Sequence, residues 1–240
     1  MFRALTFVGC AVASISATSL NAADSDTGAQ FDRSDVDRIE EDWVVYVRNP
    51  DKETGAPQIA HVISPLQSTD RIFGMVEINH QSQPRFQVGG IQVQTWLDDD
   101  YADLAYSDQN SPLNADFEKL TYTVGMQQND GAISVFVQNG QSRSWGEFAQ
   151  TPIAAKTPKT DLDLSDYSPE FSVANTTVNH GAHRVVLMYL RRVRYFSDDK
   201  LKFTDSKPQV LHRFRRVVEF VSLEEYEKKL QEFNIEITEQ

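Results

Sequence analysis

A series of short runs rich in β-branched and aromatic residues, separated by Gly, Pro, Asn and Asp, extends from Trp43 to Val221. Typical runs are "WVVYVRN", "GIQVQTW", "AISVFVQ" and "RVVLMYLRRVRYF". No long stretch in this region has the helical period, whereas the two-residue period of strands recurs. The pattern predicts an all-β domain over residues 43–221, built as a sandwich or barrel of short strands.

The two ends of the chain have a different composition. Residues 1–23 combine one early Arg with an apolar and small-residue run, which is typical of a secretory signal peptide. Residues 24–42 are acidic and poor in apolar side chains, so we expect a flexible lead-in. Residues 222–240 open with Ser222 and Glu225 in capping-box spacing, which predicts a C-terminal amphipathic helix and tail.

Net charge and cysteine content indicate the compartment in which the protein works and the classes of partner that it binds. The formal net charge is -12, and the one cysteine, Cys10, lies within the expected signal peptide. Such an acidic chain argues against nucleic acid as a partner. The N-terminal apolar run is short and rich in Ala and Ser, so we expect no membrane span. We therefore expect a secreted or periplasmic protein without disulfides.

The run "GIQVQTWLD" alternates cleanly between two faces. Ile91, Val93, Thr95 and Leu97 point one way, and Gln92, Gln94 and Trp96 point the other way. Amides donate hydrogen bonds to sugar hydroxyls and accept them, and an indole stacks on the apolar face of a pyranose. This stripe is the first candidate ligand-binding surface, with an ordinary solvent-facing sheet as the alternative interpretation.

Three further residues complete the candidate ligand-binding set. His80 lies near the end of the preceding predicted strand, and Arg85 follows in the connection. Trp145, in "NGQSRSWGEF", is expected either to anchor the core, which we favour, or to lie beside the Gln/Trp stripe. The Pro-containing span 149–167 is expected to be a long surface loop.

Neither a catalytic pair nor a metal motif emerges from the sequence. The acidic turn "LDDDYAD" supplies the oxygen ligands that calcium prefers, but it lacks the glycine and the late glutamate of an EF-hand loop. We favour a solvated turn and no cofactor, with calcium as the alternative. His180 and His183 form "HGAH", which lacks the glutamate of a zinc-protease helix.

Basic residues concentrate in the C-terminal third, in "RVVLMYLRRVRYFS". Even alternation leaves neither face of this run purely apolar, so we predict a β-bulge near Arg191 and Arg192. We favour pairing of these arginines, together with Arg194, Arg213 and Arg215, with acids of neighbouring strands or of the C-terminal helix. The alternative is a surface for an anionic ligand, since the guanidinium fork suits carboxylate and sulfate.

The strand plan, "NGQSRSWGEF" and "LRRVRYF" together resemble the concanavalin A-like lectin/glucanase sandwich. Late strands of that family often read as apolar-x-x-Val-Arg-x-aromatic, which Leu190, Val193, Arg194 and Phe196 match. The resemblance implies a two-sheet antiparallel jelly roll whose concave sheet often binds carbohydrate. It supplies no catalytic pair, because the Glu-x-Asp-x-x-Glu strand of the glucanases and the signature strands of the alginate lyases are absent.

The sequence therefore predicts a secreted, non-catalytic β-sandwich that binds a glycan or polysaccharide. Two alternatives stay open. One is a lyase or hydrolase that acts on an anionic glycan, and the other is an envelope assembly protein whose C-terminal helix docks a partner.

Overall fold

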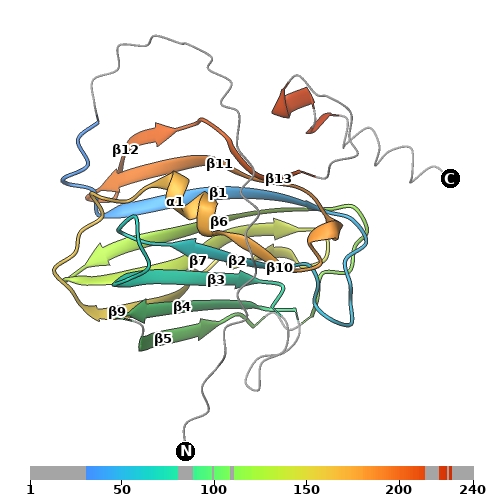
Figure 1. Cartoon of the computed structure of the whole chain (residues 1–240), viewed down its shortest axis with the longest axis horizontal. Helices are drawn as coiled ribbons and strands as arrows, with labels where there is room; N and C mark the ends of the chain where they lie inside the picture. The colour runs from blue at the N-terminus through green and yellow to red at the C-terminus, as the bar shows by residue number, and fades with distance from the viewer. Residues whose placement is uncertain are drawn as a thin grey trace, which may run out of the picture. The chain divides into compact units, whose positions relative to one another are not determined.

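The computed structural model describes residues 31–80, 89–98, 100–108, 111–213, 222–225 and 227–228. These residues form two antiparallel β-sheets, which confirms the all-β prediction (Figure 1). The expected signal peptide, Arg85 and most of the C-terminal segment lie outside the described residues.

The larger sheet has eight strands and includes the first strand of the domain. Its main path runs β12-β11-β1-β6-β7-β8, while β13 also pairs with β11 and β9 also pairs with β7. The strands are β1 (Arg38–Val47), β6 (Glu118–Asn129), β7 (Ala132–Ser142), β8 (Gly146–Phe148), β9 (Ile153–Lys159), β11 (Val185–Ser197), β12 (Lys200–Asp205) and β13 (Gln209–Arg213).

The smaller sheet has five strands in the order β10-β2-β3-β4-β5. They are β2 (Gln58–Ile63), β3 (Ile72–Ile78), β4 (Ile91–Leu97), β5 (Asp100–Tyr106) and β10 (Thr177–His180). Figure 1 shows this sheet in front of the larger one. A Cβ added at Gly74 of β3 would lie 2.4 Å from the Val135 side chain of β7, so the two sheets approach very closely there.

A histidine is sealed between the sheets. The Nε2 of His61 in β2 lies 2.7 Å from the Tyr122 hydroxyl of β6, and its ring centroid is 4.7 Å from that of Trp43 in β1. All three side chains are buried. Burial lowers the pKa of His61 to about 3, because a charged imidazole would lose its hydration.

A seven-residue helix, α1 (Pro169–Asn175), interrupts the strand pattern. Ser168 caps it by accepting a hydrogen bond from the Phe171 N–H, and Pro169 occupies the first helical turn. Figure 1 shows α1 in front of β1 and β11. Just before it, Tyr167 is buried and donates its hydroxyl hydrogen to Glu41 of β1 at 2.7 Å.

The expectation of a surface loop over residues 149–167 is therefore wrong in two places. Residues 153–159 form β9, which pairs with β7, and Leu164 and Tyr167 are buried in the core. The prolines favoured a loop, but a strand tolerates proline where its pairing is irregular. Pro158 lies within β9, next to a shift in the pairing of β9 with β7.

The flexible lead-in was expected to extend to residue 42, but β1 already begins at Arg38. Alternation along this strand turns Glu41 inward beside Trp43, whose indole N–H donates to the carboxylate at 2.8 Å. Burial raises the pKa of Glu41, and its hydrogen bonds oppose that rise. Acidic composition suggested disorder, but Glu40, Glu41 and Asp42 each have a hydrogen-bond or ion-pair partner in the fold.

The predicted bulge in β11 is present. Arg192 pairs with Asp42 and Leu190 pairs with Trp43, so Arg191 is the extra residue. The bulge resolves the mixed alternation of the sequence. It lets Leu190 and Val193, three positions apart, both be buried, while Arg192 stays partly exposed.

Two of these arginines, Arg192 and Arg194, pair with acids of β1, as we favoured. Among the described residues, Arg191 and Arg213 have no carboxylate partner, and Arg215 lies outside the described part of the chain. Arg192 Nε lies 2.5 Å from Asp42, and Arg194 lies 2.8 Å from Asp42 and 2.9 Å from Glu40. Thr123 of β6 also donates to Asp42 at 2.8 Å. These partners come from the acidic segment that was expected to be flexible.

The described part of the C-terminal segment is helical at residues 223–225 and 227–228. The Ser222 hydroxyl accepts the Glu225 N–H at 3.1 Å, in agreement with the predicted cap. Leu223 packs against an apolar cluster on the outer face of the larger sheet, and the Tyr46 hydroxyl donates to Glu227 at 3.1 Å. Most of the predicted helix lies outside the described residues.

We predict that His61 makes stability depend on pH. The folded state keeps the imidazole neutral, whereas the unfolded chain takes up a proton below about pH 6.5. The free energy of unfolding should therefore fall as the pH drops from 6.5 toward 3, by up to about 1.4 kcal/mol per pH unit from this residue. Urea denaturation at a series of pH values should show that the free energy of unfolding of His61→Gln changes less with pH than that of the wild type. Parallel profiles would contradict the assignment.

A second prediction concerns Asp42. Asp42→Asn should lower the free energy of unfolding by about 1–3 kcal/mol, because partly buried Arg192 and Arg194 lose a charged acceptor. Asp161→Asn is the matched control, since it breaks the exposed pair with Arg71 and should leave stability unchanged. Equal midpoints in thermal denaturation for the two variants would show that the Asp42 network is not stabilising.

Candidate functional site on the outer face of the smaller sheet

The structure places the Gln/Trp stripe of β4 on the outer face of the smaller sheet. Ile91, Val93 and Thr95 are fully buried, and Thr95 donates its hydroxyl hydrogen to the Lys156 carbonyl of β9 in the larger sheet. The alternate residues therefore face away from the larger sheet. Trp96 is partly exposed, so its indole is accessible to a ligand.

Three aromatic side chains form a continuous row across β3, β4 and β5, which we call the aromatic strip (Phe73, Trp96 and Tyr101). Phe73 is the cross-strand partner of Trp96, with parallel rings and centroids 5.8 Å apart. Tyr101 meets the other side of Trp96 edge-on at 5.7 Å. Tyr101 is 47% exposed, and the other two are partly exposed.

A bulge in β5 completes the strip. The pairing of β4 with β5 shifts between Thr95 and Trp96, so Ala102 is the extra residue. As a result Tyr101, rather than Ala102, lies opposite Trp96. Sequence reasoning missed Phe73 and Tyr101, because strand register decides which aromatic residues become neighbours.

Beside the strip, a carboxylate gathers three polar side chains, and we call this group the Glu77 cluster (Glu77, Gln58, Gln94 and His80). Glu77 accepts from the amides of Gln58 at 3.3 Å and Gln94 at 3.1 Å, and the His80 Nε2 lies 2.9 Å away. Because the Gln94 amide nitrogen points to Glu77, its carbonyl oxygen is left to accept a hydrogen bond from a ligand. Two of the three partners of Glu77 come from the neighbouring strands β2 and β4, so the cluster depends on strand register.

Two of the predicted ligand-binding residues have almost no surface that a ligand could contact. Gln92 is 6% exposed and His80 is 1% exposed. Gln94 is therefore the amide of the stripe that has accessible surface. The buried His80 instead contacts the Glu77 carboxylate. Arg85 falls outside the described residues.

Trp145 lies elsewhere. It follows β7 in the larger sheet, where its indole N–H donates to the Ser111 carbonyl at 2.9 Å and its ring meets Phe148 edge-on at 5.2 Å. It is partly exposed, so the favoured role of core anchor is wrong, and it is not part of the strip. The indole instead holds the segment before β6 against the β7–β8 turn.

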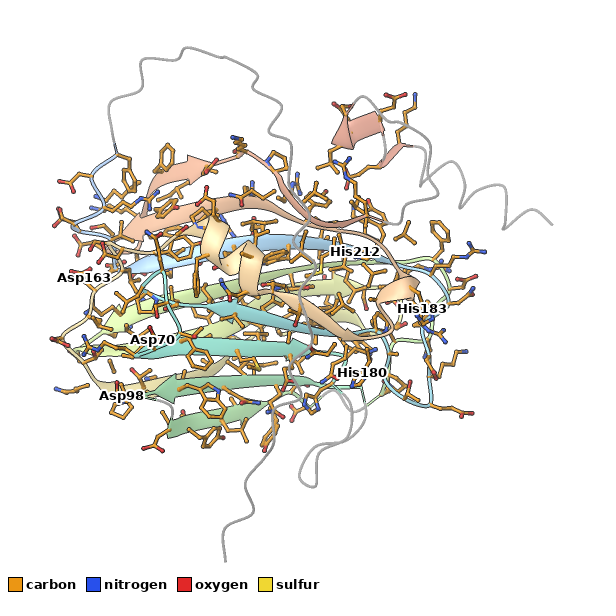
Figure 2. All side chains as sticks on the ribbon, in the orientation of Figure 1. Asp70, Asp98, Asp163, His180, His183 and His212 are labelled. Atoms are coloured by element: carbon orange, nitrogen blue, oxygen red, sulfur yellow. The ribbon has the colours of Figure 1, made fainter. Side chains whose placement is uncertain are left out.

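The predicted acidic turn lies at one end of the strip. Asp98 and Asp100 are exposed, while Asp103 accepts the Lys156 N–H of β9 at 2.9 Å and so has a structural role. Figure 2 shows Asp98 at the opposite end of the strands from His180 and His183. Across the described ranges, no three His, Cys, Asp or Glu side chains gather as a metal site requires.

No family model, curated protein or solved structure matches the chain. The site must therefore be interpreted from its own geometry. Among the described helices, none has the length and apolar character needed to cross a bilayer.

We predict that Glu77 holds the polar side of the site together. Glu77→Gln should lower the free energy of unfolding by about 1–3 kcal/mol, because the new NH2 group must replace one carboxylate oxygen and so face either Gln58 or the pair Gln94 and His80 without accepting a hydrogen bond. Glu147→Gln, at an exposed position of β8, removes the same charge and should have no effect. If chemical denaturation gave the same small change for both, the cluster would have no organising role.

Proposed function

We propose that the protein is a secreted or periplasmic, non-catalytic carbohydrate-binding protein, and that its contact surface is the aromatic strip with Gln94. The strip offers partly exposed aromatic rings from three adjacent strands, which suit the apolar faces of consecutive sugar units. The carbonyl of Gln94 supplies a hydrogen-bond acceptor for a sugar hydroxyl. The observation that carries the proposal is the partial exposure of a continuous aromatic row.

The charge around the strip favours a neutral glycan. The exposed Asp98 and Asp100 lie close to Trp96 and Tyr101 in the chain, and the Glu77 carboxylate lies on the same face of the sheet. A polysaccharide rich in carboxylate or sulfate would be repelled at this face. We therefore propose an uncharged sugar chain as the ligand, with no metal or cofactor needed for binding.

The fold expected for this function is the jelly roll of the concanavalin A-like sandwiches. Two antiparallel sheets with a strongly apolar interface support it. The jelly-roll connectivity and the C-terminal amphipathic helix remain part of this proposal. The assembly alternative is weakened because Leu223 and Glu227 contact their own sheet instead of presenting a free surface.

One observation favours hydrolysis as a second candidate function. A hollow of about 570 Å³ lies between β5 and the segment that links β8 to β9. Asp108 and Glu147 both line it, and paired carboxylates flank the scissile bond in glycoside hydrolases. The hydrogen-bonded His61 and Tyr122 do not serve as an acid–base pair, because their burial keeps a substrate away.

We predict that removing a ring of the strip weakens glycan binding. Tyr101→Ala and Trp96→Ala should each weaken binding of a neutral oligosaccharide by about tenfold or more, because stacked aromatic contacts contribute about 1.5 kcal/mol. Binding is measured on a glycan array and then by titration calorimetry. Phe203→Ala is the matched control, since Phe203 is 40% exposed but lies on β12 of the larger sheet.

Two outcomes would contradict the proposal. One is a wild-type protein that retains no glycan on the array, and the other is equal weakening by Phe203→Ala. A reducing-end assay run on the same glycans separates the candidates. Release of sugar that Asp108→Asn abolishes and Trp96→Ala leaves intact would favour the hydrolase.

A further inference from the structure

A groove of about 290 Å³ crosses the outer face of the larger sheet, and we call it the Arg191 groove. It is lined by Asp42, Trp43, Val44, Thr121, Tyr122, Thr123, Asn139, Arg191, Arg192 and Arg194. Its floor comes from the adjacent strands β1 and β6, and its sides come from β11 and β7. The groove belongs to the sheet opposite the one that carries the aromatic strip.

Two β-bulges border the groove. On β11 the extra residue is Arg191, opposite the step from Asp42 to Trp43. On β7 the pairing with β6 shifts between Thr121 and Thr123, where Asn139 has a left-handed backbone with φ of 53°. Bulges bend a strand and re-aim its side chains, and both bulges occur at the same level of the sheet.

Several polar side chains in the groove have unused hydrogen-bonding capacity. Among the described residues, the Arg191 guanidinium has no carboxylate partner, and the side chains of Thr121 and Asn139 make no hydrogen bond. Arg192 uses its Nε for Asp42, which leaves its terminal nitrogens facing outward with the side chain 40% exposed. An arginine fork, a hydroxyl and an amide are thus available together.

The groove has a positive charge in an acidic protein. Asp42 is neutralised by Arg192 and Arg194, and Glu40 lies 2.9 Å from Arg194. Arg191 is the guanidinium left over from this network. Because the chain as a whole has a net charge of -12, an anion is attracted only where such a local excess exists.

We propose that the Arg191 groove binds a carboxylate or sulfate group carried by a saccharide. Arg191 and the terminal nitrogens of Arg192 hold the anion in a fork, because planar guanidinium matches both groups. Thr121 and Asn139 contact the neighbouring hydroxyls of the sugar. The volume lies at the lower end of ordinary ligand sites, about 300–1,000 Å³, which suits a single acidic sugar unit. This site is independent of the proposed function of the aromatic strip.

The experiment measures binding of polygalacturonate, heparin, neutral dextran, free acetate and free sulfate to the purified protein at 0.15 M salt. Arg191→Gln should weaken binding of the better acidic polysaccharide by about tenfold to a hundredfold, as expected for a lost charge-assisted hydrogen bond. Arg48→Gln is the matched control, because Arg48 is exposed near the end of β1 and its loss changes the net charge equally. It should weaken binding by less than about twofold.

Two more variants define the contacts. Arg191→Lys keeps the charge but loses the fork, so it should bind less tightly than the wild type and should not restore full affinity. Thr121→Val should weaken binding of the saccharide several-fold and leave binding of free sulfate unchanged, because only the saccharide brings a hydroxyl to that position. Trp96→Ala should have no effect, which separates this site from the aromatic strip.

Four results would overturn the proposal. They are no binding of either acidic polysaccharide by the wild type, equal weakening by Arg191→Gln and Arg48→Gln, full affinity in Arg191→Lys, and free sulfate binding as tightly as the sulfated saccharide. The second and third would indicate diffuse charge attraction, and the fourth would indicate a site for a small free anion.

Discussion

The pairing of β1 with β11 is the constraint on which the rest of the structure depends. One extra residue, Arg191, shifts the register so that Leu190 and Val193 both enter the core. The same shift brings Arg192 and Arg194 opposite Asp42 and Glu40. Without the bulge, either the apolar side chains or the arginines would lie on the wrong face of the sheet. Core packing and surface charge are therefore fixed by a single backbone irregularity.

The two outer faces of the protein differ in chemistry because of their strand registers. On the smaller sheet, a bulge at Ala102 aligns Tyr101 with Trp96 beside exposed acids. On the larger sheet, bulges on β11 and β7 border a groove with spare guanidinium groups. The first face suits an uncharged, flat ligand, and the second suits an acidic one.

Local patterns predicted the fold class well, since strand period and turn residues are local properties. The bulge near Arg191 and the outward position of Trp96 also follow from alternation within one strand. The start of β1 at Arg38 could not be predicted in this way, because the partners of Asp42 are distant in the sequence, and Arg192 follows it by 150 positions. Composition alone makes such an acidic segment look unfolded.

The candidate site was predicted only in part for the same reason. Gln94 and Trp96 are recognisable on one strand, whereas Phe73, Tyr101 and Glu77 join them through cross-strand register. Register is a relation between strands, and a single strand does not contain it. The burial of Gln92 and the separate position of Trp145 likewise depend on what packs around them.

The central position of β1 also has a consequence for the order of synthesis. Among the described strands β1 is the first to be made. It nevertheless lies between β6 and β11, and β11 comes near the end of the described domain. A growing chain can form the β2-β3-β4-β5 sheet early, but β1 must keep an open edge until Val185 onward has been synthesised. The domain therefore cannot fold progressively from its N-terminus. Its larger sheet closes late through contacts of long sequence separation, which makes slow, cooperative folding the expected behaviour.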